Sequence, residues 1–168
     1  VPEGRTVIFH AENGVLGFGG VPGSKEDEKP YYLGANGIPF TPLPGASFFH
    51  HADSFAMIRG GHIDVTVLGA LQVSEKGDLA NWTFPERGLG NIGGAMDLAA
   101  GCNKVIIAME HVTPKGQMKI LKACSYPLTA ARCVKLIVTD IAVLQVTAEG
   151  LVLAETAPGW TAEEVQAL

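Results

Sequence analysis

Short helical segments alternate along this chain with runs of β-branched residues, and that alternation restricts the folds open to it. Helices are expected at residues 53–59 and 95–100, because each segment is followed by glycine, which commonly comes after the last helical turn. Strands are expected at residues 63–68 and 104–110, where β-branched residues are concentrated. This order is typical of an α/β fold, so we expect a three-layer α/β/α architecture with a mostly parallel sheet.

The last third of the chain adds further elements to this pattern. Thr161 and Glu164 have the spacing of a capping box, in which each side chain accepts a hydrogen bond from the other residue's backbone amide. A helix is therefore expected at the end of the chain. The other expected elements are a helix around residues 128–134, strands at 136–138 and 141–146, and a hairpin about residues 149–153.

Residues 6–17 combine an apolar run with a carboxylate and turn residues. Residues 7–9 favour a buried strand, whereas Asn13-Gly14 is a turn dipeptide that lets another molecule approach the backbone closely. Glu12 stands between them, at the end of the expected strand. Open α/β sheets bind ligands at the carboxyl ends of their strands, so Glu12 is a candidate catalytic carboxylate. The alternative is a polar strand end that faces solvent or pairs with an arginine.

The composition limits the partners of the chain. Charged residues make up only 17% of its 168 residues, against roughly 25% in average proteins, so we expect another chain to cover part of the surface. The net charge is −5 and no lysine or arginine cluster occurs, which argues against DNA or RNA as a partner. The length fits a single domain, residues 1–168.

The cysteines and the apolar runs indicate a cytoplasmic protein. Cys102, Cys124 and Cys133 match no disulfide framework or metal motif, so we expect reduced, buried thiols. No apolar run reaches the roughly 18 residues that span a bilayer, and no signal-peptide pattern opens the chain, so no membrane partner is expected. Because the chain starts at Val1 and its last expected helix is cut off at Leu168, we expect truncation at both ends.

Two glycine-rich stretches are candidates for binding. Residues 18–44 form a long irregular segment, and such segments usually line a site or contact a partner. Gly93-Gly94 precedes an expected helix, so backbone amides there could face a developing negative charge; a tight turn or a phosphate-binding loop are the alternatives. Residues 90–94 lack the ending of a P-loop and the spacing of a dinucleotide fingerprint, which argues against ATP and NAD.

Other polar residues give weaker indications. His50, His51 and Asp53 lie close together but fit no recognised metal-ligand spacing, so we expect loop histidines and Asp53 as a helix N-cap. His111 follows an expected strand and is expected to be structural. No Gly-x-Ser-x-Gly elbow occurs, so the sequence does not support a serine hydrolase.

Many motifs of this chain occur in the order found in one known family. The chain resembles the B subunit of the class I (3-oxoacid) CoA-transferases, which include succinyl-CoA:3-ketoacid and acetate CoA-transferases. The resemblance covers most of the chain. It rests on residues 12–17, 53–64, 68–73, 79–82, 93–98, 108–111, 119–122 and 127–129.

The chain departs from the family pattern in three places. The family usually has serine before the glutamate and often glutamine before that, where this chain has Ala11 and His10. Asn91-Ile92 stands where Gly-Met is commoner in the family. Asparagine tolerates the left-handed backbone that such a loop can require. Residues 18–44 match poorly, so the resemblance does not identify the acid substrate.

The resemblance implies a ribose-phosphate-isomerase-like CoA-transferase fold and a ping-pong transfer of CoA from an acyl-CoA to a carboxylic acid. It implies that Glu12 is the nucleophile, which becomes a glutamyl-CoA thioester, and that a backbone amide of Gly93 stabilises the oxyanion. No metal or cofactor is implied, because acyl-CoA is a co-substrate. The residues expected beside the bound CoA are Asn13, Gly14, Gly17 and Gly94.

The resemblance also implies a partner, an A subunit that is separate or fused in front of this half, and a heterotetramer with the active site between the halves. Two other functions stay open at the level of the sequence. One is a sugar-phosphate isomerase of the related fold that uses Glu12 as a base. The other is an acyl-CoA-binding subunit without turnover.

Overall fold

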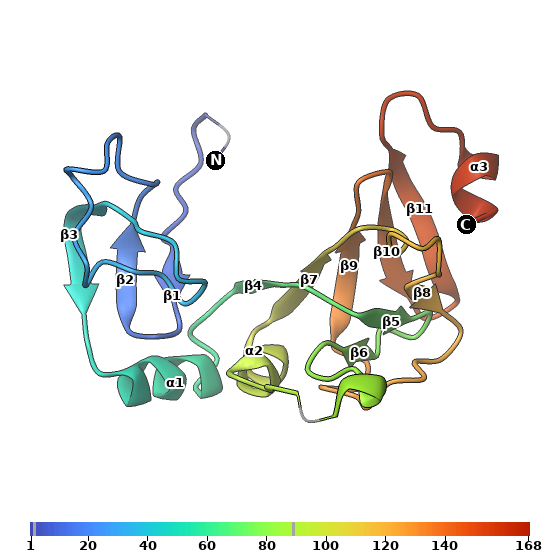
Figure 1. The fold of residues 1–168 in the computed structure, drawn as a ribbon, viewed down its shortest axis with the longest axis horizontal. Coiled ribbons are helices and arrows are strands. Elements are labelled where there is room, and N and C mark those ends of the chain that lie inside the picture. The colour runs from blue at the N-terminus through green and yellow to red at the C-terminus, as the bar shows by residue number, and fades with distance from the viewer. Residues whose placement is uncertain (2, 89) are drawn as a thin grey trace. The chain divides into compact units, whose positions relative to one another are not determined.

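The alternation of helices and strands expected from the sequence is present in the computed structural model, which describes residues 1, 3–88 and 90–168 (Figure 1). The chain divides into two compact units, Val1–Met57 and Ile58–Leu168. Each unit has its own sheet and its own apolar core. The expectation that residues 1–168 form a single domain stays a prediction.

The first unit is built on an antiparallel sheet in the order β1-β2-β3. Ala11 lies opposite Val15, and Val15 lies opposite Phe48, so residues 12–14 form the turn between the first two strands. Phe40 completes a buried core with Ala11 and Val15. The elements that begin in this unit are β1 (His10–Ala11), β2 (Val15–Phe18), β3 (Pro42–Phe48) and α1 (His51–Arg59).

The apolar run at residues 7–9 is not the buried strand that its composition predicts. Val7, Ile8 and Phe9 are 52%, 66% and 47% exposed, and β1 begins only at His10. Because β1 is the edge strand of a small sheet, the described residues of this unit place no layer over the run. Glu12 therefore follows a strand of an antiparallel sheet, and the expectation that it lies at the edge of a parallel sheet is wrong.

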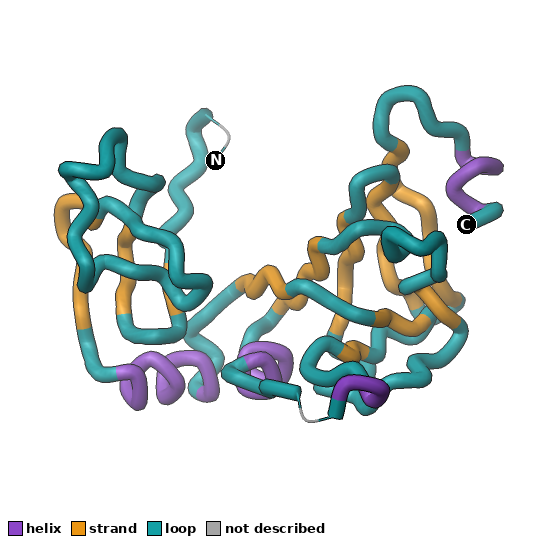
Figure 2. The backbone as a smooth tube through the Cα atoms, in the orientation of Figure 1, coloured by secondary structure: helices purple, strands orange, loops and turns teal. Residues whose placement is uncertain are grey.

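The irregular segment expected at residues 18–44 is confirmed for most of its length. Figure 2 shows residues 19–41 as loop between β2 and β3. The segment ends earlier than expected, because β3 already begins at Pro42 and contains Pro44. A strand at the edge of a sheet tolerates proline, since only one side of its backbone has to pair.

The second unit is built on a mixed sheet, which has the order β11-β10-β9-β7-β4 among the described residues (Figure 1). Neighbours β4, β7 and β9 are parallel, whereas β9, β10 and β11 are antiparallel neighbours. The α/β class is thus confirmed, and the sheet is mixed because the hairpin expected about residues 149–153 continues it. The strands are β4 (Val65–Leu68), β7 (Lys104–Ala108), β9 (Val134–Val138), β10 (Ala142–Thr147) and β11 (Gly150–Thr156).

The core of the second unit lies between this sheet and the segments packed against it. Val105 and Ile107 of β7 and Val134 and Ile137 of β9 are at most 1% exposed. Burying a side chain of this size stabilises the fold by about 1.5–3 kcal/mol, so these strands anchor the unit. The helix α2 (Ala95–Gly101) adds Ala99 to the same cluster.

A small second sheet in this unit explains why one expected helix is missing. The strands β5 (Gln72–Ser74), β6 (Leu79–Ala80) and β8 (Ile120–Leu121) pair in the order β6-β5-β8. The backbone amide of Thr129 donates to the Leu79 carbonyl at 2.7 Å, and the Leu79 amide donates to Ala130 at 2.8 Å. Pairing with β6 replaces helical hydrogen bonds, so the helix expected around residues 128–134 is wrong.

The C-terminal helix is confirmed together with its cap. Thr161 Oγ1 accepts from the Glu164 amide at 3.2 Å, and the Thr161 amide donates to Glu164 Oε2 at 2.9 Å. Among the described residues no helix is both long and apolar enough to cross a membrane. The remaining short elements are a 3₁₀ helix, η1 (Pro85–Arg87), and the capped helix α3 (Ala162–Gln166).

Candidate functional site

Glu12 is the first residue of the turn between β1 and β2. The Gly14 amide donates to the Ala11 carbonyl at 3.0 Å and closes the turn around Glu12 and Asn13. Gly14 has a φ of +121°, which favours glycine, and a Cβ at this position would collide with the Phe49 carbonyl oxygen. Glu12 itself is half-buried. Its carboxylate is thus carried by a backbone segment whose conformation the neighbouring residues fix.

The other residues expected around Glu12 lie on the same hairpin. Asn13 Nδ2 donates to the Leu33 carbonyl at 2.8 Å, which ties the turn to the irregular segment. Gly17 has a φ of +80°, and its amide donates to the Phe9 carbonyl at 2.8 Å. The structure therefore brings Glu12, Asn13, Gly14 and Gly17 together, although their role beside CoA stays a prediction.

His10, two residues before Glu12, has a buried partner that the sequence did not reveal. Its Nε2 lies 2.8 Å from Ser54 Oγ of α1, and its ring stacks on Phe49 at 6.2 Å between centroids and 12° between planes. Burial lowers the pKa of His10. Ser54 is fully buried, whereas a serine in a helical segment is equally compatible with solvent. Only the three-dimensional pairing identifies it.

Gly93 and Gly94 belong to the second unit and precede α2. Gly94 is the N-cap residue of this helix, and Gly93 has a φ of +50°. The Gly93 amide donates to Asn91 Oδ1 at 3.1 Å. Asn91 does not adopt the left-handed backbone that asparagine tolerates, since Arg132 is the only described residue other than glycine with a positive φ. Leu89 of the same loop lies outside the described residues.

Helix α1 begins earlier than its sequence indicates. His50 precedes the helix and its Nδ1 accepts from the Ala52 amide at 3.1 Å, so His50 rather than Asp53 caps the helix. Asp53 lies in the first turn, where a negative charge is favourable. Within the described parts of the chain, no group of three or more His, Cys, Asp or Glu residues is arranged to hold a metal ion.

His111 and Cys124 have structural surroundings. His111 is 5% exposed, its amide donates to Asp140 Oδ1 at 2.7 Å, and its Nδ1 lies 3.0 Å from Thr139 Oγ1. Burial lowers the pKa of His111, and the nearby Asp140 opposes this change. Burial, assisted by Asp78, raises the pKa of Cys124 to about 11. A thiol with such a pKa is a poor nucleophile at neutral pH, so catalysis by Cys124 is disfavoured.

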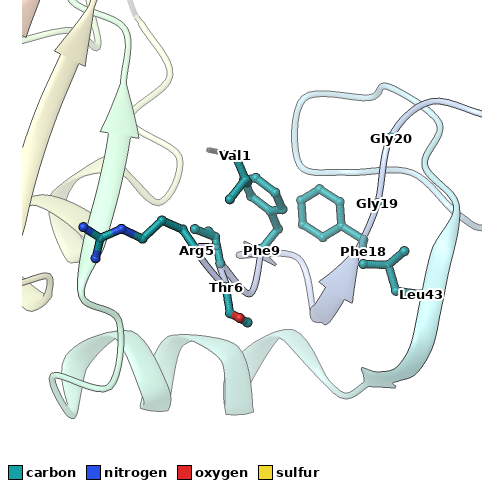
Figure 3. A pocket seen from close by; sticks show the side chains of 9 residues that line it. Val1, Arg5, Thr6, Phe9, Phe18, Gly19, Gly20 and Leu43 are labelled. Carbon is teal, nitrogen blue, oxygen red and sulfur yellow. The ribbon is translucent and has the colours of Figure 1, made fainter. Parts of the chain in front are cut away.

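An open hollow of about 520 Å³ lies on the first unit (Figure 3). Its lining is mostly apolar and includes Phe9, Phe18 and Leu43, with Arg5 at one side. Glu12 is not among the described residues that line it. The site is therefore assigned from the turn that holds Glu12 and not from the position of this hollow.

Comparison with known proteins places these features in a family context. A family model described as Coenzyme A transferase matches residues 3–168. The B subunit of 3-oxoadipate CoA-transferase from Pseudomonas putida is 48% identical over 165 residues, which are 98% of this chain and 77% of that protein. The B subunit of succinyl-CoA:3-ketoacid coenzyme A transferase from Helicobacter pylori is 44% identical over 166 residues, covering 98% of this chain and 79% of that protein.

A solved structure supports the fold. The crystal structure of an acyl-CoA transferase apoenzyme from Escherichia coli O157:H7 matches with a TM-score of 0.72 at 19% sequence identity. The match covers 94% of this chain and 31% of that one, so this chain spans about a third of that protein. At this level of identity the likeness shows a common fold.

Proposed function

This chain belongs to the coenzyme A transferase family, and from this premise we propose that it is the half of an enzyme that accepts CoA covalently during its transfer from an acyl-CoA to a carboxylic acid. The observation that carries the proposal is the fixed turn that holds Glu12, in a chain whose family match spans residues 3–168. The relatives are named as B subunits, so we propose an A subunit as the partner, in a heterotetramer.

The proposed reaction begins at the Glu12 carboxylate. It attacks the thioester carbonyl of an acyl-CoA, and loss of CoA thiolate leaves an acyl-glutamyl anhydride. The thiolate then attacks the glutamyl carbonyl, which releases the first acid as a carboxylate and leaves a glutamyl-CoA thioester. An incoming carboxylate reverses both steps, so the products are a new acyl-CoA and the original Glu12 carboxylate.

Positioning is the main contribution that this chain can make to the first step, because a carboxylate is a modest nucleophile towards a thioester. A reacting group that is held in place avoids much of the entropic cost of bringing two reactants together. The Gly14 turn and the bond from Asn13 to Leu33 restrict the backbone on both sides of the Glu12 side chain. These contacts support Glu12 as the attacking group.

The oxyanion that forms at the thioester carbonyl requires a hydrogen-bond donor. By resemblance, we assign the Gly93 amide to this role, with Gly94 as the second choice. Because the Gly93 amide donates to Asn91 Oδ1, the exposed Asn91 side chain has to release it before an oxyanion can bind. Losing one such donor typically costs about 100- to 1,000-fold in rate.

The substrates are proposed from chemistry and from the names of the relatives. We propose an acyl-CoA such as succinyl-CoA or acetyl-CoA as donor and a carboxylate such as a 3-oxoacid as acceptor, with no metal or further cofactor. The relatives are named for 3-oxoadipate and for 3-ketoacids, which are acids of this class. A matrix of acyl-CoA donors and acids, measured with the co-expressed partner, identifies the preferred pair.

Kinetics of a Glu12→Asp variant test the proposed role. Shortening the side chain by one carbon retracts the carboxylate, so kcat for CoA transfer should fall by about 100-fold or more while the melting temperature hardly changes. Glu149→Asp is a matched control, because Glu149 also lies in a hairpin turn, between β10 and β11. Near-normal kcat in Glu12→Asp would contradict the nucleophile assignment.

A further inference from the structure

The turn that carries Glu12 is attached to the rest of its unit through His10. His10 Nε2 lies 2.8 Å from Ser54 Oγ, and Ser54 is 0% exposed within α1. A buried hydroxyl is costly to leave without a partner, so this bond favours one position of the ring. The strand residue two positions before Glu12 is thereby fixed to a helix.

The same ring connects to the far side of the turn. It stacks on Phe49, whose amide donates to the Gly14 carbonyl at 3.0 Å. The Phe49 carbonyl oxygen fills the space in which a Gly14 Cβ would stand. Phe49 therefore contacts the turn at Gly14, which follows Glu12 in the chain. His10 precedes Glu12, so the two points of attachment lie on either side of Glu12.

The hydrogen bonds that hold the turn around Glu12 are made by its neighbours. Glu12 is half-buried, and the bonds that define its surroundings are made by its neighbours: the Gly14 amide to Ala11, and Asn13 Nδ2 to Leu33. These bonds fix the backbone from which the Glu12 side chain extends. A change at His10 that loosens the first strand would move the carboxylate without removing any group that reacts.

We propose that His10 is a positioning residue for Glu12, which acts through its hydrogen bond to Ser54 and its stacking on Phe49 to fix the turn at residues 11–14. This inference rests on the proposed function, because it concerns the orientation of the Glu12 nucleophile. A simple packing role for His10 would affect stability alone. A positioning role also affects kcat in the folded enzyme.

The test compares single and double variants in the complex with an A-type partner. His10→Ala should lower kcat by about tenfold or more with little change in KM for acyl-CoA, because a small misplacement of a reacting group lowers its rate steeply. His10→Gln should restore most of kcat, since its amide can still bond to Ser54 Oγ. The double variant should lose about as much as His10→Ala alone, because the bond to Ser54 is already lost in His10→Ala. Ser54→Ala should lower kcat by less, because it removes the hydrogen bond and keeps the stacking of His10 on Phe49.

His111→Ala is the matched control, because it also removes a histidine that is bonded to a hydroxyl, that of Thr139. It should lower the melting temperature and leave kcat per folded molecule unchanged. Normal kcat in His10→Ala, or fully additive losses in the double variant, would overturn the positioning role. If His10→Ala does not fold, kcat of Ser54→Ala is compared with kcat of the parent. An unchanged kcat in Ser54→Ala would then overturn the positioning role.

A second measurement separates this inference from the proposed function. Single-turnover experiments follow the rate at which the Glu12 peptide gains a CoA adduct. An adduct that forms in the parent and forms as fast in His10→Ala contradicts the positioning role alone. A parent that transfers CoA without any adduct on Glu12 contradicts the proposed nucleophile and, with it, this inference.

Discussion

At the scale of single residues, a few positions hold the backbone of the site in one conformation. Gly14 is the clearest, because it combines a φ of +121° with the close approach of the Phe49 carbonyl oxygen. Asn13 and Gly17 add one hydrogen bond each to the same hairpin. Together they fix the backbone that carries Glu12, so function and local stability depend on the same residues.

Replacing Gly14 with alanine should lower both stability and activity. A non-glycine residue with this φ costs about 1–3 kcal/mol, and the contact with Phe49 adds to the loss. Urea unfolding and kcat for CoA transfer measure the two effects. Gly23→Ala is the control, since open space surrounds Gly23 and its φ is not positive; its change should stay within about 0.5 kcal/mol. Equal stability of the two variants would contradict the assigned strain.

Two histidines should make the stability depend on pH. Burial lowers the pKa of His10 and of His111 below the ordinary value of 6.5. Near pH 6.5 the unfolded chain therefore binds more protons than the folded protein does. The contribution of these histidines to stability is fully present above this pH and is lost as the pH falls towards their folded-state pKa. The free energy of unfolding should be lower at pH 5.5 than at pH 7.5, and His111→Gln should reduce the difference. An unchanged difference in this variant would contradict the role of His111.

At the scale of elements, one carboxylate organises the turn between β5 and β6. Asp78 Oδ2 accepts from the buried Ser74 hydroxyl at 2.8 Å, and Asp78 Oδ1 accepts from the Arg132 amide at 3.0 Å. The second bond holds residues 130–133 against β6, where Leu79 pairs with Ala130. A side chain in one turn thus fixes a segment more than fifty positions later in the chain.

Asp78→Ala should destabilise the second unit. It leaves the Ser74 hydroxyl buried without its acceptor, which costs about 1–3 kcal/mol. Thermal and urea unfolding measure the change. Asp27→Ala is matched to it, because Asp27 also accepts from a serine, Ser24, but both residues are exposed, so little loss is expected. A loss of equal size in both variants would contradict the importance of burial at Asp78.

The elements also explain which parts of the fold the sequence can predict. The strands around Val105 and Ile137 lie inside the mixed sheet, between other strands, and bury their β-branched residues, so composition alone identifies them. Residues 7–9 have the same composition, but their position beside an edge strand leaves them exposed. The helix expected at residues 128–134 fails for a related reason, because β6 and Asp78 supply tertiary hydrogen bonds that no local pattern reveals.

The sequence also predicts only part of the candidate site. Asn13 and Gly14 lie in the expected turn, because Asn-Gly pairs favour turns whatever sheet they join. The pairing of His10 with Ser54 was not predictable, since the two residues are 44 positions apart and belong to different elements. Long-range partners of this kind require the fold.

At the scale of the whole molecule, the two compact units differ in the size of their cores. The unit Ile58–Leu168 contains a large cluster of buried aliphatic residues, including Val73, Leu79 and Ile107. Among the described residues of the unit Val1–Met57, the buried hydrophobic side chains are only those of Ala11, Val15 and Phe40, with a few aromatic rings against them. Small units that bury little apolar area are marginal on their own.

A fragment of residues 58–168 should therefore fold without the first unit. It keeps every strand of the mixed sheet, so circular dichroism and a dispersed NMR spectrum should show a cooperative structure. A fragment of residues 81–168 is the control, because it lacks β4, β5 and β6 and should remain unfolded. An unfolded 58–168 fragment would contradict the independence of this core.

The covalent intermediate on Glu12 is the most direct test of the proposed function. The protein is incubated with its A-type partner and an acyl-CoA, digested, and the peptide that contains Glu12 is weighed by mass spectrometry. We expect this peptide to gain CoA with the loss of one water, and an added carboxylic acid to remove the adduct. A Glu12 peptide that stays unmodified while acyl-CoA is turned over would contradict the proposed mechanism.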